Sequence, residues 1–62
     1  MEVKYRGKYY RFDKRMTVKR ILEELNINPE TVMVARNGEL VTKDETINPE
    51  DSIKIVPVIS GG

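Results

Sequence analysis

The chain has 62 residues with a formal net charge of +1, and it contains neither cysteine nor histidine. A sequence of this length forms one small domain at most. Without those two residue types it offers no disulfide, no thiol nucleophile, no imidazole base and no thiolate or imidazole metal ligand, which argues against a stand-alone enzyme and predicts that no metal site is present.

A β-hairpin is predicted at the start of the chain. The segment EVKYR, residues 2–6, alternates in polarity and is rich in strand-forming residues, and YYRFD, residues 9–13, is the matching return strand. Gly7 lies between them and can adopt the positive φ that a tight turn needs. The side chains expected to face the core are Val3, Tyr5, Tyr10 and Phe12.

One amphipathic helix is predicted after this hairpin. Its apolar side chains recur at spacings of three and four residues and form one stripe of Val18, Ile21, Leu22 and Leu25. Thr17 precedes the stripe and can cap the helix, because its hydroxyl can accept a hydrogen bond from a free backbone N–H of the first turn. Asn26 can end the helix, and Pro29 prevents its continuation.

A second hairpin is predicted around Asn37-Gly38. This dipeptide favours a two-residue type I′ turn, in which both residues have a positive φ. It lies between the segments VMVAR and ELV, residues 32–36 and 39–41. Strict alternation would place Arg36 on the inward side of its strand, so we expect its aliphatic stem to lie along the sheet edge with the charge in water.

The last third of the chain predicts a loop and one further strand. The polar segment TKDET, residues 42–46, is expected to be a loop from which Ile47 enters the core. After the turn NPEDS, the segment IKIVPVI, residues 53–59, reads as the last strand. Pro57 cannot donate to a ladder, so it should lie at an unpaired position or near the strand end.

The order strand, strand, helix, strand, strand, strand predicts an α+β fold of the β-grasp (ubiquitin-like) type. One helix with one apolar stripe should lie across one face of a mixed sheet of four to five strands. Central parallel strands tend to be apolar on both faces, so we expect the last strand to pair in parallel with the first at the sheet centre. The predicted domain covers residues 1–59, and residues 60–62 form a flexible tail.

The two faces of the last strand are expected to have different roles. Ile53 and Ile55 should point under the helix, which leaves Lys54, Val56 and Val58 on the opposite face. Met33 and Ala35 should join them if Val32 and Val34 point inward. The exposed apolar patch so formed would let a partner hold the body beside the tail. The same pattern fits a strand whose second face is also covered by a core.

The tail consists of Ser60, Gly61 and Gly62. Two glycines without Cβ atoms form a strip thin enough to thread a narrow channel. The group they would present is the carboxylate of Gly62, which becomes an electrophile only when one oxygen is converted to a leaving group, for instance as an acyl-adenylate. The sequence has no G-x-x-x-x-G-K-[ST] loop for ATP, so a second protein would have to activate it. Alternatively, terminal glycines are a disordered end or a cloning remnant.

Four segments together resemble the ubiquitin-like sulfur-carrier family, the ThiS/MoaD-like proteins that include small archaeal modifiers. They are TVKRILEELNI, VMVARNGELV, INPEDSIKIVPVI and the final SGG, and the similarity spans essentially the whole chain. Family members commonly carry a glycine-aspartate pair before the last strand. This chain has Glu50-Asp51 there, so the turn lacks the usual glycine.

The resemblance implies a sulfur-carrier cycle. A partner activating enzyme uses its own ATP to adenylate the Gly62 carboxylate, and a sulfur donor such as a desulfurase persulfide displaces AMP to leave a thiocarboxylate. A downstream synthase then uses the sulfur for thiamine or molybdopterin biosynthesis. The chain itself would bind no cofactor and would not be an enzyme. The residues expected to contact partners are Gly61, Ser60, Val58, Val56 and Met33.

Other functions stay open beside this one. A ubiquitin-like modifier would use the same activation and then form isopeptide bonds through Gly62. A non-catalytic β-grasp module that binds nucleic acid or protein would use the basic hairpin and leave the tail idle. A small designed domain with a glycine tail is a further alternative. The first twenty residues hold most of the cations: Lys4, Arg6, Lys8, Arg11, Lys14, Arg15, Lys19 and Arg20.

We interpret those cations as a solvated surface that pairs with the acidic remainder of the chain, so nucleic acid is not expected as a partner. The sequence also shows no signal peptide and no apolar run long enough for a membrane span. The expectation is therefore a cytoplasmic monomer that docks on larger proteins and does not contact a membrane.

Overall fold

The computed structural model describes residues 1–58. In chain order its elements are β1 (Glu2–Tyr5), β2 (Lys8–Arg11), β3 (Met16–Thr17), α1 (Val18–Glu24), the short 3₁₀ helix η1 (Pro29–Thr31), β4 (Val32–Arg36), β5 (Glu39–Val41), β6 (Thr46–Ile47) and β7 (Ser52–Pro57). Residues 59–62, and with them the predicted boundary between domain and tail, lie outside this description.

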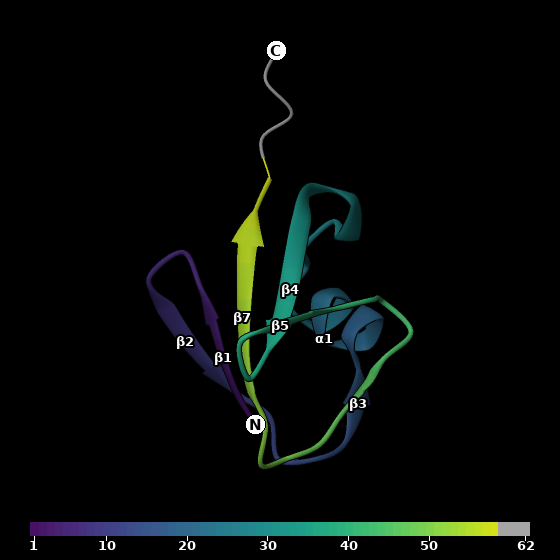
Figure 1. Cartoon of the computed structure of the whole chain (residues 1–62). Coiled ribbons are helices and arrows are strands. Elements are labelled where there is room, and N and C mark those ends of the chain that lie inside the picture. The colour runs from purple at the N-terminus through teal and green to yellow at the C-terminus, as the bar shows by residue number, and fades with distance from the viewer. Residues whose placement is uncertain (59–62) are drawn as a thin grey trace.

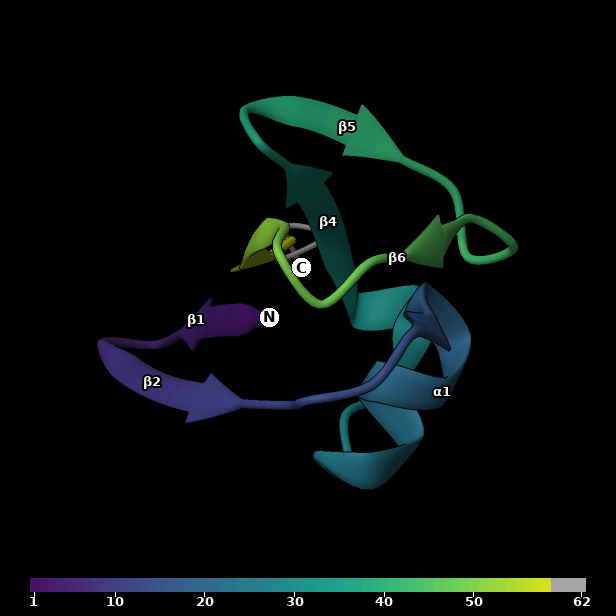
Figure 2. The same cartoon turned by 90° about the horizontal axis from the view of Figure 1, so that it is seen from below.

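Strand β7 lies inside a five-stranded mixed sheet whose order is β2-β1-β7-β4-β5 (Figure 1). It runs parallel to β1, with Ile53 opposite Val3, and antiparallel to β4, with Ile55 opposite Val34. Pro57 is the last residue of β7, as expected for a residue that cannot donate to a ladder. The helix α1 covers one face of this sheet (Figure 2). The predicted α+β fold of the β-grasp type is confirmed.

Both hairpins of the sheet close through turns with two positive φ angles. In the β4–β5 turn, Asn37 has a φ of 51° and Gly38 a φ of 90°, which confirms the predicted type I′ geometry. The β1–β2 turn has the same character, with φ angles of 51° at Arg6 and 77° at Gly7. The sequence pointed only to the glycine there, because arginine gives no local signal for a left-handed backbone.

The ends of α1 are capped as the sequence predicts. The hydroxyl of Thr17 accepts a hydrogen bond from the backbone N–H of Arg20 at 3.2 Å. At the other end Asn26 has a φ of 60°, and the backbone N–H of Ile27 donates to the carbonyl of Leu22 at 2.8 Å. A left-handed residue followed by this bond is a Schellman cap, in which asparagine takes the place usually held by glycine.

The core lies between α1 and the inner face of the sheet. The helix contributes Val18, Ile21 and Leu22, each 1% exposed, and Ile47 is fully buried as predicted. The remaining buried apolar residues are Met1, Val3, Met16, Val32, Val34, Ile53 and Ile55. The partly buried residues packed against them include Tyr5, Tyr10, Phe12 and Leu25. The residues predicted to face the core from the hairpin and the helix therefore do so.

One small ladder was not predicted. Strand β3 pairs with β6 in a separate antiparallel ladder, with Met16 opposite Ile47 and Thr17 opposite Thr46. The sequence suggested that residues 42–46 are wholly a loop. Strands of two residues show no periodic pattern. Only the tertiary structure therefore reveals that Thr46 and Ile47 pair with the two residues that directly precede α1.

Arg36 ties the end of β4 to the segment before Ile47. Its Nη1 donates a hydrogen bond to the carbonyl oxygen of Thr46 at 3.2 Å and lies 3.6 Å from a carboxylate oxygen of Glu45. The side chain is 33% exposed. The expected position along the sheet edge with the charge in water is therefore wrong in both respects: β4 lies between β7 and β5, and the guanidinium is held by polar partners on a neighbouring segment.

Asn37 also joins the β4–β5 turn to the start of β7. Its side-chain Oδ1 accepts from the backbone N–H of Ser52 at 3.0 Å, and its Nδ2 donates to Asp51 Oδ1 at 3.2 Å. The other carboxylate oxygen of Asp51 accepts from the backbone N–H of Asn48 at 3.0 Å. Since Glu50 is not among the described residues with a positive φ, this turn closes without the glycine that resembling proteins carry.

We expect the stability of the fold to depend on the protonation of Asp51. The backbone hydrogen bond from Asn48 is the main cause that lowers the pKa of Asp51 below its ordinary value, and the Asn37 amide contributes further. A carboxylate with a lower pKa in the folded state stabilises the fold above its unfolded pKa, and this stabilisation is lost as the pH falls through the folded value.

The measurement is the free energy of unfolding by urea at a series of pH values from 7 to about 2. An Asp51→Asn variant should be less stable than the wild type at neutral pH, and the difference should shrink in acid. A constant difference between the two proteins across this range would contradict the assignment.

Candidate functional site

The sheet face turned away from α1 is called here the outer face. Figure 2 shows α1 and the β3–β6 segment on one side of the sheet, and no described element covers the opposite side. Along β7, Ile53 and Ile55 are each 3% exposed, whereas Val56 between Ile55 and Pro57 is 41% exposed. The alternation of β7 therefore directs Ile53 and Ile55 into the core, and Lys54 and Val56 to the outer face.

An apolar strip lies on this face at the end of β7. It consists of Met33, Val56 and Val58, which are 40%, 41% and 44% exposed. Met33 and Val56 are direct cross-strand neighbours. The backbone N–H of Val58 donates to the carbonyl of Thr31 at 2.8 Å, which extends the pairing of β7 beyond Pro57. The structure thus brings together three of the predicted partner-binding residues and leaves them uncovered by a second core.

A row of side chains that includes two lysines crosses the outer face next to the apolar strip. The strand registers form one line across all five strands, which consists of Tyr9, Lys4, Lys54, Ala35 and Leu40. The Nζ of Lys4 lies 5.8 Å from the centre of the Tyr9 ring, within reach of a cation–π interaction. The sequence placed Lys54 and Ala35 on this face, but it could not place Lys4 and Tyr9 beside them, because that requires the exact parallel register of β1 against β7.

The remaining predicted site residues are Ser60, Gly61 and Gly62, which lie outside the described residues. The structure shows where the described part of the chain ends before them. Strand β7 ends at Pro57, and Val58 of the apolar strip is the last described residue. In Figure 1 this end of β7 lies at the opposite end of the sheet from the N-terminus. Any partner that reaches the tail at its base therefore also meets the apolar strip.

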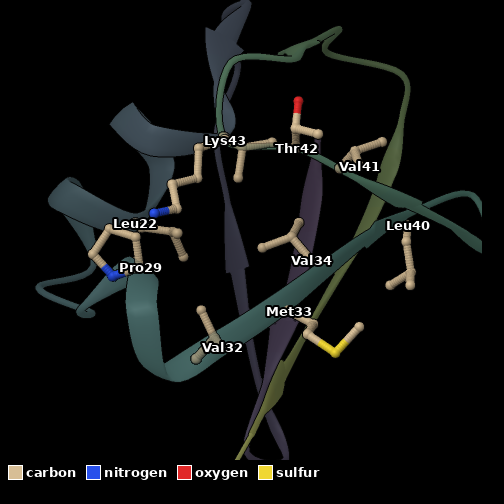
Figure 3. Close-up of a pocket in the computed structure, with 10 residues that line it drawn as sticks. Leu22, Pro29, Val32, Met33, Val34, Leu40, Val41, Thr42 and Lys43 are labelled. Carbon is tan, nitrogen blue, oxygen red and sulfur yellow. The ribbon is translucent and has the colours of Figure 1, made fainter.

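A cavity of about 350 Å³ opens between α1 and the β4–β5 hairpin. Figure 3 shows Val32 and Val34 on its helix side, whereas Met33 and Leu40 point away toward the other face of the sheet. Its lining is apolar apart from Thr42 and Lys43. No set of groups that could act on a bound molecule converges there, so the outer face remains the candidate site.

Two further classes of site were sought in residues 1–58. That range holds no group of three or more acidic side chains arranged to bind a metal ion. Over the same range, no helix has both the length and the apolar character needed to cross a membrane.

Comparison with known proteins gives consistent relationships. The model of the ThiS family matches residues 3–62. The sulfur carrier protein TtuB of Thermus thermophilus is 42% identical over 45 residues, which cover 73% of this chain and 69% of that protein.

A solved structure shows the same arrangement of elements. The thiamine biosynthesis protein ThiS from Geobacter metallireducens superposes with a TM-score of 0.71 at 25% sequence identity, and the match covers 100% of both chains. The family match spans nearly the whole sequence, and the β-grasp sheet and helix agree with this structural neighbour. The chain therefore belongs to the ThiS family.

Proposed function

We infer that this protein is a sulfur carrier whose working group is the carboxylate of Gly62. The observation that carries the inference is the family match, because it runs from residue 3 through Gly62 and so includes both glycines. The 42% identical relative is itself described as a sulfur carrier protein. The described residues contribute a docking face rather than a set of reactive side chains, which agrees with a carrier that other enzymes act upon.

The proposed chemistry takes place on the acyl carbon of Gly62. A carboxylate oxygen attacks the α-phosphorus of ATP held by a partner activating enzyme, and pyrophosphate leaves. The terminal sulfur of a persulfide on the sulfur donor then attacks the acyl carbon of the adenylate, and AMP leaves. A thiol reduces the resulting acyl disulfide and releases the thiocarboxylate. The chain supplies no nucleotide site in this sequence, so the ATP and the sulfur donor belong to its partners.

The apolar strip is proposed to hold the body against those partners. Met33, Val56 and Val58 form a contiguous exposed surface at the base of the tail, and exposed apolar patches of this kind mark sites of protein association. Ser60 and Gly61 would then enter the partner's channel behind Gly62, because residues with little or no side chain allow close approach of the backbone.

The proposed destination of the sulfur is a precursor held by a synthase of thiamine or molybdopterin biosynthesis. The structural neighbour is described as a thiamine biosynthesis protein, which favours the thiamine branch. In this cycle the protein acts as a cytoplasmic monomer that visits the activating enzyme, the desulfurase and the synthase in turn.

The test is the mass of the C-terminal peptide. Incubation of the protein with the adenylating enzyme of its own cell, ATP and a persulfide donor should add the mass difference between sulfur and oxygen to the peptide that ends in Gly62. Omission of ATP is the control and should leave the mass unchanged. An unchanged mass with all components present would overturn the proposal, and isopeptide-linked conjugates that persist under reducing, denaturing conditions would show a modifier instead.

A further inference from the structure

Two lysines lie side by side in the middle of the outer face. The parallel register of β1 and β7 places Lys4 directly opposite Lys54, and both residues are exposed. Like charges that face each other across a strand pair destabilise the sheet. Within residues 1–58 the ion pairs involve Arg20 and Arg36 and neither of these lysines. Neither lysine therefore has an ion-pair partner among the described residues, although the ammonium group of Lys4 lies over the Tyr9 ring.

A hollow adjoins this pair of lysines. It has a volume of about 260 Å³, and the residues around it include Lys4, Lys54, Tyr9, Ala35 and one acidic residue, Glu2. The small side chain of Ala35, directly opposite Lys54, leaves room beside the two ammonium groups. Two lysines against the single carboxylate of Glu2 leave the hollow with a surplus positive charge. That surplus suits a further carboxylate group, which accepts charge-assisted hydrogen bonds.

The lysine pair is continuous with the apolar strip. Lys54 and Val56 are two residues apart on β7, and Ala35 and Met33 are two residues apart on β4, so all four lie on the outer face. A nucleic acid backbone would satisfy the cations and leave the apolar strip in water. A protein surface with an apolar centre and an acidic border matches both parts at once, as protein interfaces commonly do.

We propose that the Lys4–Lys54 pair binds an aspartate or glutamate side chain on the partner activating enzyme, next to the apolar contact made by Met33 and Val56. This assignment rests on the proposed carrier function. It identifies the partner by its chemistry. The partner surface has an acidic side chain beside an apolar patch, and the two are separated by the spacing of Lys54 and Val56 along β7. Charges at such a border accelerate association and select partners, so the effect depends on salt.

The test uses a Lys54→Glu variant and the activating enzyme that supports the mass gain described above. The dissociation constant at about 50 mM salt should rise by about tenfold or more relative to the wild type, and the gap should narrow at about 500 mM salt because screening weakens the ionic contact. The thermal midpoint should be no lower than that of the wild type, because the new glutamate faces Lys4 and removes a repulsion.

Three further variants serve as comparisons. Lys19→Glu makes the same charge change on α1, on the opposite side of the sheet, and should bind nearly as the wild type does. The double variant Lys4→Arg/Lys54→Arg keeps both charges and should keep its affinity. Val56→Ser should weaken binding to a similar extent at both salt concentrations, because an apolar contact is not screened.

The outcomes separate the two proposals. If the wild type gains sulfur but Lys54→Glu binds the enzyme as tightly as the wild type, or no more weakly than Lys19→Glu, the lysine assignment is wrong and the carrier function stands. If no adenylating enzyme of the cell changes the mass of the wild type, the carrier function fails and the assignment fails with it. A salt-dependent loss confined to Lys54→Glu supports the assignment.

Discussion

Removal of Gly61 and Gly62 is expected to abolish thiocarboxylate formation and to leave the unfolding transition unchanged. The buried core extends from Met1 to Ile55, so the deletion touches none of the described packing. It does remove the acyl carbon from the position that the activating enzyme would reach. The measurements are the mass of the C-terminal peptide after the activation reaction and the thermal midpoint of the purified variant.

A matched variant with one alanine added after Gly62 tests whether the position of the terminal carboxylate matters when both glycines are kept. It keeps both glycines but moves the carboxylate one residue further, by about 3.3–3.6 Å. We expect this variant to bind the activating enzyme but to gain sulfur more slowly than the wild type. If the shortened chain without Gly61 and Gly62 still gained sulfur, the working group would have to lie elsewhere on the protein.

The Ile21→Ala variant is expected to lose about 2–5 kcal/mol of unfolding free energy, because truncation of a buried isoleucine removes apolar contact and leaves a cavity. Ile21 is 1% exposed at the centre of the helix stripe. A chain of 62 residues has a typical total stability of about 3–9 kcal/mol. The variant should therefore lose a large fraction of its total stability, seen as a marked fall in the urea midpoint measured by circular dichroism.

Leu40→Ala is the matched control for this prediction. Leu40 is 65% exposed on β5, and truncation of an exposed side chain away from special features usually changes stability by less than about 0.5 kcal/mol. Equal losses in the two variants would contradict the assignment of the core to the inner face of the sheet.

The parts of the fold that could be predicted from the sequence are those fixed by neighbours in the chain. The Thr17 cap, the helix stripe and the Asn37-Gly38 turn each depend on a few consecutive residues whose backbone preferences agree. The central place of β7 was also predictable, since an almost continuous apolar strand is stable only between others.

The parts that could not be predicted depend on residues far apart in sequence. The β3–β6 ladder joins Met16 to Ile47, and the polar link between Asn37 and Asp51 spans the β4–β5 hairpin and the turn before β7. Neither has a periodic pattern that single-sequence reasoning could detect. The backbone of the turn at Asp51 is instead held by side-chain hydrogen bonds, which explains why glycine is not needed before it.

The candidate site was predicted in part for the same reason. Alternation along β7 correctly separated Ile55 from Val56, but it could not tell whether the second face was covered or exposed. The facing of Lys4 and Lys54 follows only from the register of two strands that lie at opposite ends of the sequence. The structure is therefore needed to see that apolar and cationic residues form one surface.

The double-sided pairing of β7 has a mechanical consequence. A pull on the chain beyond Pro57 acts along β7, and it loads the ladders to β1 and β4 lengthwise and together. The edge strands β2 and β5 are each paired on one side within the five-stranded sheet, so they could be peeled away one hydrogen bond at a time. A partner that pulls on the carboxyl end of the chain therefore pulls on a strand that is hydrogen-bonded on both sides, and the body should stay folded under that tension.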